Sequence, residues 1–268
     1  MAFASNRCGD FLYYTVPAFT ETGLVHHGFT TRLGGVSAPP LDRMNLGIGR
    51  GDDPAAVREN YAIAGRAIGF PPERLVFFPQ VHGSDIFVAG ERDAGMGFRA
   101  ARPEFDGIIT NEKNLPLATF HADCTPIFLL DPVRGVAGVV HAGWRGTARR
   151  AAGCAVAKMQ EVFACRPQDI LAGIGPCGRS CCYETDQDVP DAMRAALGEG
   201  AGAHMHRAGA KWRVDLAGLN RLVLLQSGVQ AEHITMSELC TCCQPDVFWS
   251  HRRTGGVRGA MAAIIMLV

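Results

Sequence analysis

The sequence predicts a mixed fold of the α+β class, with one compact domain that spans residues 1–268. Short β-rich runs bounded by Gly, Pro, Asp and Asn are interspersed with longer stretches in which apolar residues recur about every 3.6 positions. These strand and helix patterns do not alternate at regular intervals, which argues against a doubly wound parallel sheet. No low-complexity linker, charge block or repeat divides the chain, so we expect a single domain.

Seven short apolar runs predict strands. They cover residues 75–78, 108–110, 118–120, 127–130, 136–141, 170–174 and 262–268. The last one belongs to the longest apolar run, residues 260–268, which has about half of the ~20 residues that a membrane-spanning helix needs. We therefore expect a buried C-terminal strand and no membrane span.

Four amphipathic stretches predict helices. They cover residues 54–68, 147–163, 190–197 and 216–227. Asp53 is a suitable N-cap for the first helix, because its side chain can accept a hydrogen bond from a free N–H group of the first turn. Pro54 and Pro190 suit the first position of a helix, where no N–H donor is required.

The composition predicts a globular protein without a nucleic-acid or membrane partner. Hydrophobic residues make up 47% of the chain, and 26 basic residues balance 26 acidic ones. A net charge of zero provides no electrostatic attraction to nucleic acid or to an anionic membrane. Neither G-x-G-x-x-G nor G-x-x-x-x-G-K follows a predicted strand, which argues against NAD- and ATP-type phosphate cradles. Residues 1–14 have no basic segment followed by an apolar one, so we expect a cytoplasmic protein.

The ten cysteines are expected to be free thiols, because a cytoplasmic protein rarely contains disulfides. Two clusters stand out, one with Cys177, Cys181 and Cys182 and the other with Cys240, Cys242 and Cys243. A structural zinc site with four sulfur ligands is one interpretation of these clusters. Their spacing, C-x-x-x-C-C and C-x-C-C, lacks the paired C-x-x-C pattern of such sites, so we favour ordinary buried thiols.

Three segments each place a metal ligand at the end of a β-like run, next to small residues. They are Gln-Val-His-Gly with His82, His-Ala-Asp-Cys with Cys124, and Val-His-Ala-Gly with His141. Two histidines and a cysteine form a three-ligand zinc set that leaves a fourth position for water or substrate, as in catalytic sites. A thiol nucleophile is the alternative, with Cys124 activated by a histidine and oriented by Asp123. Spacing alone does not decide between the two.

Ordered motifs along the chain resemble those of the YfiH-like family, from about His27 to the C-terminus. They are His-Gly-Phe-Thr-Thr-Arg-Leu-Gly-Gly-Val-Ser at 27–37, Asn-Leu-Gly at 45–47, Gly-Asp-Asp-Pro at 51–54, Gln-Val-His-Gly at 80–83, Ala-Asp-Cys at 122–124, His-Ala-Gly-Trp-Arg-Gly at 141–146, Gly-Pro at 175–176, Cys-Tyr-Glu at 182–184 and Ser-His-Arg-Arg at 250–253. The family was long described as laccase-domain or multicopper polyphenol oxidase proteins and is now regarded as purine nucleoside phosphorylases.

The resemblance implies a function and a ligand set. It implies that His82, Cys124 and His141 bind zinc, with copper as an alternative metal. It implies phosphorolysis of adenosine, inosine and methylthioadenosine to the free base and a ribose 1-phosphate, with adenosine deamination as a second activity. It also implies antiparallel sheets flanked by helices. The expected partners are therefore a purine nucleoside and phosphate, bound by a monomer or small homo-oligomer.

Such reactions need groups that bind phosphate and carry protons. Arg32, Arg58 and Arg145 are the candidate phosphate ligands, because a guanidinium presents a planar fork to phosphate oxygens. Asp123 precedes Cys124 and is a candidate proton carrier or a partner of the metal ligands. His121, where the family usually has a small residue, could compete as a ligand. Residues 177–181 and 257–261 also depart from the family pattern.

Three other functions compete with this one. Copper-dependent oxidation of phenols is disfavoured, because nine scattered histidines do not supply the several His-rich clusters of a multicopper oxidase. A peptidoglycan-editing amide hydrolase could use the same zinc set. A binding module with a structural zinc would instead need a fourth protein ligand at the metal.

Overall fold

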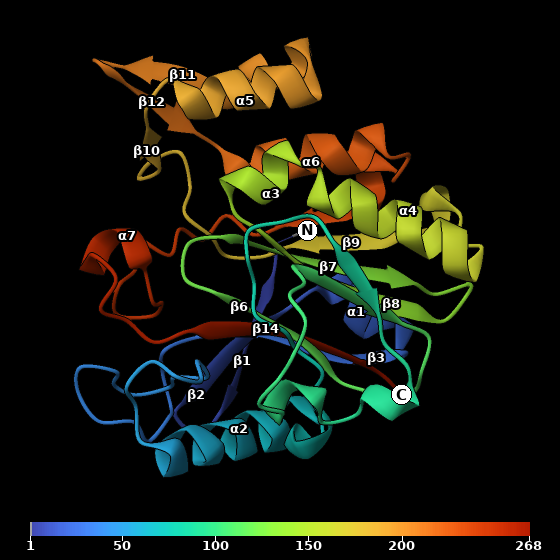
Figure 1. Ribbon diagram of the computed structural model, residues 1–268, viewed down its shortest axis with the longest axis vertical. Helices are drawn as coiled ribbons and strands as arrows, with labels where there is room; N and C mark the ends of the chain where they lie inside the picture. Colours follow the sequence, from blue (N-terminus) through green and yellow to red (C-terminus); the bar gives the residue numbers. More distant parts are fainter. Residues whose placement is uncertain (1) are drawn as a thin grey trace.

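The computed structural model describes residues 2–268, which form two large sheets packed face to face, with helices on both outer sides (Figure 1). The first sheet has five strands in the order β1-β2-β3-β14-β6, all antiparallel to their neighbours. Its strands are β1 (Ala4–Cys8), β2 (Phe11–Thr15), β3 (Val25–Thr30), β6 (Leu117–His121) and β14 (Met261–Leu267).

The second sheet has six strands in the order β13-β9-β7-β8-β5-β4. Its strands are β4 (Ile86–Val88), β5 (Gly107–Thr110), β7 (Thr125–Asp131), β8 (Val136–Ala142), β9 (Leu171–Ile174) and β13 (Ile234–Met236). The two outermost pairs, β13 with β9 and β4 with β5, are parallel, and the inner pairs are antiparallel. A small third sheet has the order β10-β12-β11, with β10 (Glu184–Thr185), β11 (Met205–Ala208) and β12 (Lys211–Val214).

Seven α-helices accompany the sheets within the described part of the chain. They are α1 (Pro17–Thr22), α2 (Pro54–Ile68), α3 (Trp144–Ala148), α4 (Ala151–Phe163), α5 (Asp188–Leu197), α6 (Leu216–Gln226) and α7 (His251–Thr254). In Figure 1, α2 lies below the five-stranded sheet, and α4 and α6 lie above the six-stranded sheet. The order of layers is therefore helix, sheet, sheet, helix.

The side chains of β14 explain why its sequence is apolar throughout. Ile265 and Ala263 belong to the core between the two sheets, together with Phe128 of β7. Ile264 and Ala262 point the other way, into the core between the five-stranded sheet and α2. Because successive side chains of a strand face opposite sides, a strand buried on both faces has no polar positions. A third core fills the space between the six-stranded sheet and the helices α4 and α6.

The α+β class and six of the seven expected strands are confirmed, including the buried C-terminal strand. The strand expected at residues 75–78 is wrong: Val76 makes a single bridge to Leu117, and the segment is otherwise extended chain. The phenylalanines of that segment are buried, which accounts for its strand-like composition. The strands of the N-terminal hairpin, β1 and β2, were not predicted.

The four expected helices are present, with two corrections to their bounds. Residues 147–163 form two helices, α3 and α4, separated at Arg150, whose φ of 59° breaks the α-helical path. Pro190 does not begin α5, which starts at Asp188. The N-cap of α2 is confirmed, because the Asp53 carboxylate accepts a hydrogen bond from the N–H of Ala55 at 2.8 Å. Within residues 2–268, no helix has the length and apolar character needed to cross a membrane.

Candidate metal centre and active site

Strand pairing brings together the three ligand candidates. The antiparallel register of β7 and β8 pairs Pro126 with His141, so Cys124, just before β7, lies at the same end of the sheet. His82 follows the extended segment that contains Val76. The ligand atoms of His82, Cys124 and His141 all lie within 4.8 Å of one another. The structure therefore places the three residues in a set that could hold a metal ion.

A buried carboxylate, Asp106, connects two of these residues. Its side chain accepts hydrogen bonds from the backbone N–H groups of Val81, His82 and Gly83, at 3.1, 3.0 and 2.6 Å. It also contacts Nδ1 of His141 at 2.8 Å, which leaves Nε2 of that ring free to act as a ligand. His82 has a φ of 59°, an uncommon conformation for a residue with a side chain, and these bonds hold it there. Sequence reasoning did not identify Asp106.

The charges of the set favour a bound cation. Burial alone would raise the pKa of the Cys124 thiol, but His141 and His82 lower it to about 6. Burial alone would lower the pKa of His141, but Cys124 and Asp106 raise it to about 9. Cys124 is therefore disposed to be a thiolate, the form that binds metals.

Gly143, which follows β8, leaves room for the ligands. A Cβ atom at this position would lie 2.7 Å from Cδ2 of His82 and 3.0 Å from Sγ of Cys124. Contacts this short require the ligands to move. The glycine of the His-Ala-Gly-Trp-Arg-Gly motif therefore has a steric role next to the site.

His121 is bonded on both sides of its ring to other protein groups. Its Nε2 lies 2.9 Å from Oγ1 of Thr119, and its Nδ1 lies 3.1 Å from the carbonyl oxygen of Cys124. Burial, followed by the neighbouring His141, lowers its pKa well below the usual value. The ring is therefore neutral and supports the backbone of Cys124, and neither nitrogen is free to compete for a metal.

Asp123 is held firmly next to Cys124. Its carboxylate accepts hydrogen bonds from Oγ1 of Thr241 at 2.6 Å, Oγ of Ser250 at 3.0 Å and the backbone N–H of Arg252 at 2.7 Å. Its φ of 89° lies in the left-handed region. These three donors occupy the carboxylate and fix the backbone that leads into Cys124.

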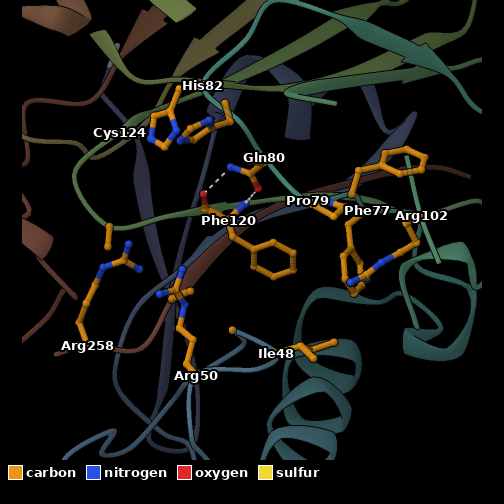
Figure 2. Close-up of a pocket in the computed structure, with 15 residues that line it drawn as sticks. Ile48, Arg50, Phe77, Pro79, Gln80, His82, Arg102, Phe120, Cys124 and Arg258 are labelled. Carbon is orange, nitrogen blue, oxygen red and sulfur yellow. Dashed lines mark hydrogen bonds between the residues drawn. The ribbon is translucent and has the colours of Figure 1, made fainter. Parts of the chain in front are cut away.

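A cavity of about 290 Å³ opens beside the three ligand candidates (Figure 2). Phe77, Phe78 and Phe120 provide apolar walls, and the side chain of Gln80 holds the backbone of Phe120 with two hydrogen bonds. Three arginines also line the cavity. They are Arg50, Arg102 and Arg258.

Arg50 and Arg258 lie next to each other, below His82 and Cys124 in Figure 2. Burial, followed by the charge of Arg50, lowers the pKa of Arg258 to about 10. Neither arginine has an acidic partner within 4.0 Å in the described chain, and Nε of Arg258 is buried without a hydrogen-bond partner there. Arg258 is partly buried and Arg50 is exposed at the mouth of the cavity, and two adjacent cations without an ion-pair partner are typical of a site for an anion.

The three arginines predicted from the sequence lie elsewhere. Arg32 stacks on Trp249 with its guanidinium carbon 4.0 Å from the ring centre, and it donates to the carbonyl oxygens of Asp42 and Pro245. Arg145 stacks on Trp144 at 4.3 Å. Arg58 lines an adjoining hollow, which shares Arg102 with the cavity. None of the three lines the cavity beside the ligand candidates.

Fold and site together define a four-layered α+β protein with a two-histidine, one-cysteine centre beside an arginine-lined cavity. Residues 26–268 match the family described as multi-copper polyphenol oxidoreductase laccase, and the chain belongs to this family. The YfiH-like resemblance expected from the motifs is thereby confirmed.

Relatives and solved structures agree with this assignment. The chain is 40% identical over 241 residues to "Purine nucleoside phosphorylase YlmD" of Bacillus subtilis. The matched region covers 89% of this chain and 87% of the relative. The crystal structure of YlmD from Geobacillus stearothermophilus superimposes with a TM-score of 0.93 at 38% identity and covers 99% of this chain and 98% of that one. The Bacillus licheniformis hypothetical protein YfiH also gives a TM-score of 0.93, at 33% identity and with 99% of each chain covered.

Proposed function

We propose that this chain is a zinc-dependent purine nucleoside phosphorylase that acts on adenosine, inosine and methylthioadenosine and also deaminates adenosine. Relatives named purine nucleoside phosphorylases support the reaction class. The observation that carries the proposal is the pair Arg50 and Arg258, which lies in the same cavity as the ligand candidates and has no acidic partner within the described chain. A phosphorolytic enzyme needs such a cationic site for its second substrate.

The donor set fits zinc, which His82, Cys124 and His141 would hold. Asp106 orients His141, as carboxylates commonly orient histidine ligands of zinc. When bound, zinc supplies a Lewis acid that stabilises negative charge on a reacting group of the substrate. Copper is the alternative metal, and elemental analysis distinguishes the two.

The chain itself positions the two substrates. Arg50 and Arg258 hold phosphate with their guanidinium groups, so that one of its oxygens attacks C1′ of the ribose as the bond to the base breaks. Phe120, which is partly exposed and lines the cavity, provides an apolar surface against which a purine can pack. Asp123, with three donors on its carboxylate, positions Cys124 rather than carrying a proton.

The test incubates the purified protein with adenosine, with and without phosphate, and separates the products. Phosphorolysis yields adenine and ribose 1-phosphate only with phosphate, whereas deamination yields inosine and ammonia in either case. We expect His141→Ala to abolish both reactions, because the metal serves both. If neither reaction occurs in the zinc-loaded protein, the proposal is wrong.

Arginine variants separate the two reactions. We expect Arg258→Ala to raise the KM for phosphate about 10- to 100-fold, the loss of roughly 1.5 to 3 kcal/mol for a hydrogen bond to a charged group. Deamination should change much less, because phosphate is not its substrate. Arg58→Ala is the matched comparison, since Arg58 lies in the adjoining hollow and should affect phosphate binding less. If Arg58→Ala raised the KM for phosphate more than Arg258→Ala did, Arg58 rather than Arg258 would be the phosphate ligand.

A further inference from the structure

Four cysteine sulfur atoms from two distant parts of the sequence gather at a second place in the fold. The ligand atoms of the four residues all lie within 4.8 Å of one another. The sulfur of Cys243 lies 3.4 Å from that of Cys181 and 3.2 Å from that of Cys182. These thiols are free, and the fourth member, Cys240, is buried. Tetrahedral zinc with zinc–sulfur bonds of ~2.3 Å places its sulfur ligands about 3.8 Å apart, which is close to the spacing observed here.

The spacing of Cys240 and Cys243 in the sequence agrees with a metal site. Cys240 and Cys243 are separated by two residues, the C-x-x-C spacing of a zinc knuckle, which the intervening Cys242 obscured. The partner pair, Cys181 and Cys182, is adjacent in a tight turn, in which the N–H of Cys182 donates to the carbonyl oxygen of Arg179.

Backbone hydrogen bonds hold the two segments in place. Cys177 and Cys240 form a parallel bridge, and the N–H of Thr241 donates to the carbonyl oxygen of Cys177 at 3.0 Å. These backbone contacts fix the positions of the two segments that carry the four cysteines relative to each other.

Two arginines lie next to the cluster. Arg213 donates to the carbonyl oxygen of Cys181 at 2.9 Å, and Arg253 donates to that of Cys242 at 3.5 Å. Four thiolates around a divalent cation carry two net negative charges, which Arg253 offsets in part, whereas Arg213 also pairs with the carboxylate of Glu184 at 3.1 Å. An anionic metal–thiolate centre is therefore compatible with its surroundings.

We propose a second metal site in this chain, a structural zinc site with four thiolate ligands, formed by Cys181, Cys182, Cys240 and Cys243. Four protein ligands leave no open position, so this zinc has no catalytic role of its own. The proposal does not depend on the proposed function. It replaces the sequence-based interpretation of these residues as ordinary buried thiols.

The second zinc links the segment with Cys181 and Cys182 to the segment with Cys240 and Cys243, and both segments contact the candidate active site. Thr241, between two of the ligands, donates to the carboxylate of Asp123, and the N–H of Gly178 donates to the carbonyl oxygen of the same residue at 2.8 Å. Asp123 precedes Cys124, a ligand candidate of the other site. The structural zinc thereby fixes the loops from which the catalytic centre is built.

Metal content of the full chain, purified under reducing conditions, tests the proposal. We expect about two zinc ions per chain, one after Cys182→Ser and one after Cys124→Ala, which empties the other site. Cys154→Ser is the matched control, because Cys154 lies on α4 outside both clusters, and it should keep both ions. Cobalt in the Cys124→Ala protein should show the strong near-ultraviolet absorption of several thiolates on one ion.

Cys243→Ser, at an exposed ligand, provides a second test if Cys182→Ser does not fold. Alkylation of the native Cys124→Ala protein should spare the exposed thiols of Cys181 and Cys243 until a chelator is added. The proposal is overturned if the wild-type chain holds one zinc, with no change after Cys182→Ser or Cys243→Ser. It is equally overturned if mass analysis finds these four cysteines in disulfides, or if the cluster holds iron and sulfide.

Discussion

The carboxylate of Asp106 couples two ligands of the candidate metal centre. It holds the backbone of His82 in its left-handed conformation through three N–H groups and orients His141 through a fourth hydrogen bond. Burial raises the pKa of this carboxylate, but His141 and the N–H of Gly83 outweigh burial, so the net pKa is lowered. Asp106 is therefore ionised, and one charged group sets the geometry of two ligands.

A second buried residue, His27 of β3, makes the stability of the protein depend on pH. Its Nε2 accepts a hydrogen bond from the N–H of Val16 at 2.8 Å, so the ring is neutral in the folded chain. Burial lowers its pKa from 6.5 to about 4. Below about pH 6.5 the unfolded chain binds a proton that the folded chain does not, so stability falls as the pH drops from 6.5 towards 4.

We therefore expect the wild-type protein to lose about 2 to 3 kcal/mol more than His27→Gln between pH 7 and pH 4.5. Glutamine can accept the same hydrogen bond but cannot take up a proton. The measurement is urea unfolding at both pH values. Equal losses for the two proteins would mean that His27 does not titrate in this range.

Sequence reasoning selected His82, Cys124 and His141 because each follows or ends an apolar run beside small residues, a local pattern. The structure brings these three together. Arg50 and Arg258 could not be predicted in this way, because they come from loops about 200 residues apart and share no local pattern. Their proximity results from long-range packing that brings the two loops to one cavity.

At the scale of elements, the turn from β8 into α3 determines whether the ligands can approach one another. We expect Gly143→Ala to weaken zinc binding about 10- to 100-fold, the range found when groups that orient metal ligands are disturbed. The added Cβ would lie 2.7 Å from the His82 ring, while the φ of −73° suits alanine, so the fold should be retained. Zinc titration and circular dichroism measure the two effects.

Gly202→Ala is the control for this variant, because a Cβ at Gly202 would meet nothing within 4 Å. It should bind zinc as the wild-type protein does. Unchanged zinc affinity in Gly143→Ala would show that the ligand candidates do not bind the metal in the arrangement described.

Elements with a strong local periodicity were predicted well, and elements defined by long-range contacts were not. The helix over residues 54–68 has its cap, proline and apolar stripe in sequence, and its bounds agree with α2. The break at Arg150 could not be seen, because the apolar spacing continues through it into α4. Residues 75–78 have the composition of a strand, but only Val76 finds a partner, so burial rather than pairing explains their composition.

For the whole molecule, two adjacent isoleucines of β14 test the layered architecture. Ile264 and Ile265 are both fully buried, the first against α2 and the second between the sheets. Each isoleucine-to-alanine substitution should cost about 2 to 5 kcal/mol, because each leaves a cavity in a different core. Val133→Ala, at a residue that is 66% exposed, should change stability by less than about 0.5 kcal/mol. Denaturant unfolding checks all three, and a small loss at either isoleucine would contradict the packing of that layer.

The position of β14 has a consequence for the synthesis of the protein. Although it comes last in the sequence, it lies inside the five-stranded sheet, between β3 and β6. Until residues 258–267 have been synthesised, those two strands lack this partner, and the cavity lacks Arg258 and Ala260. Exposed strand edges of this kind invite aggregation. Closure of the sheet and completion of the cavity therefore occur together, after residues 261–267 emerge, and a nascent chain that stops before them has neither.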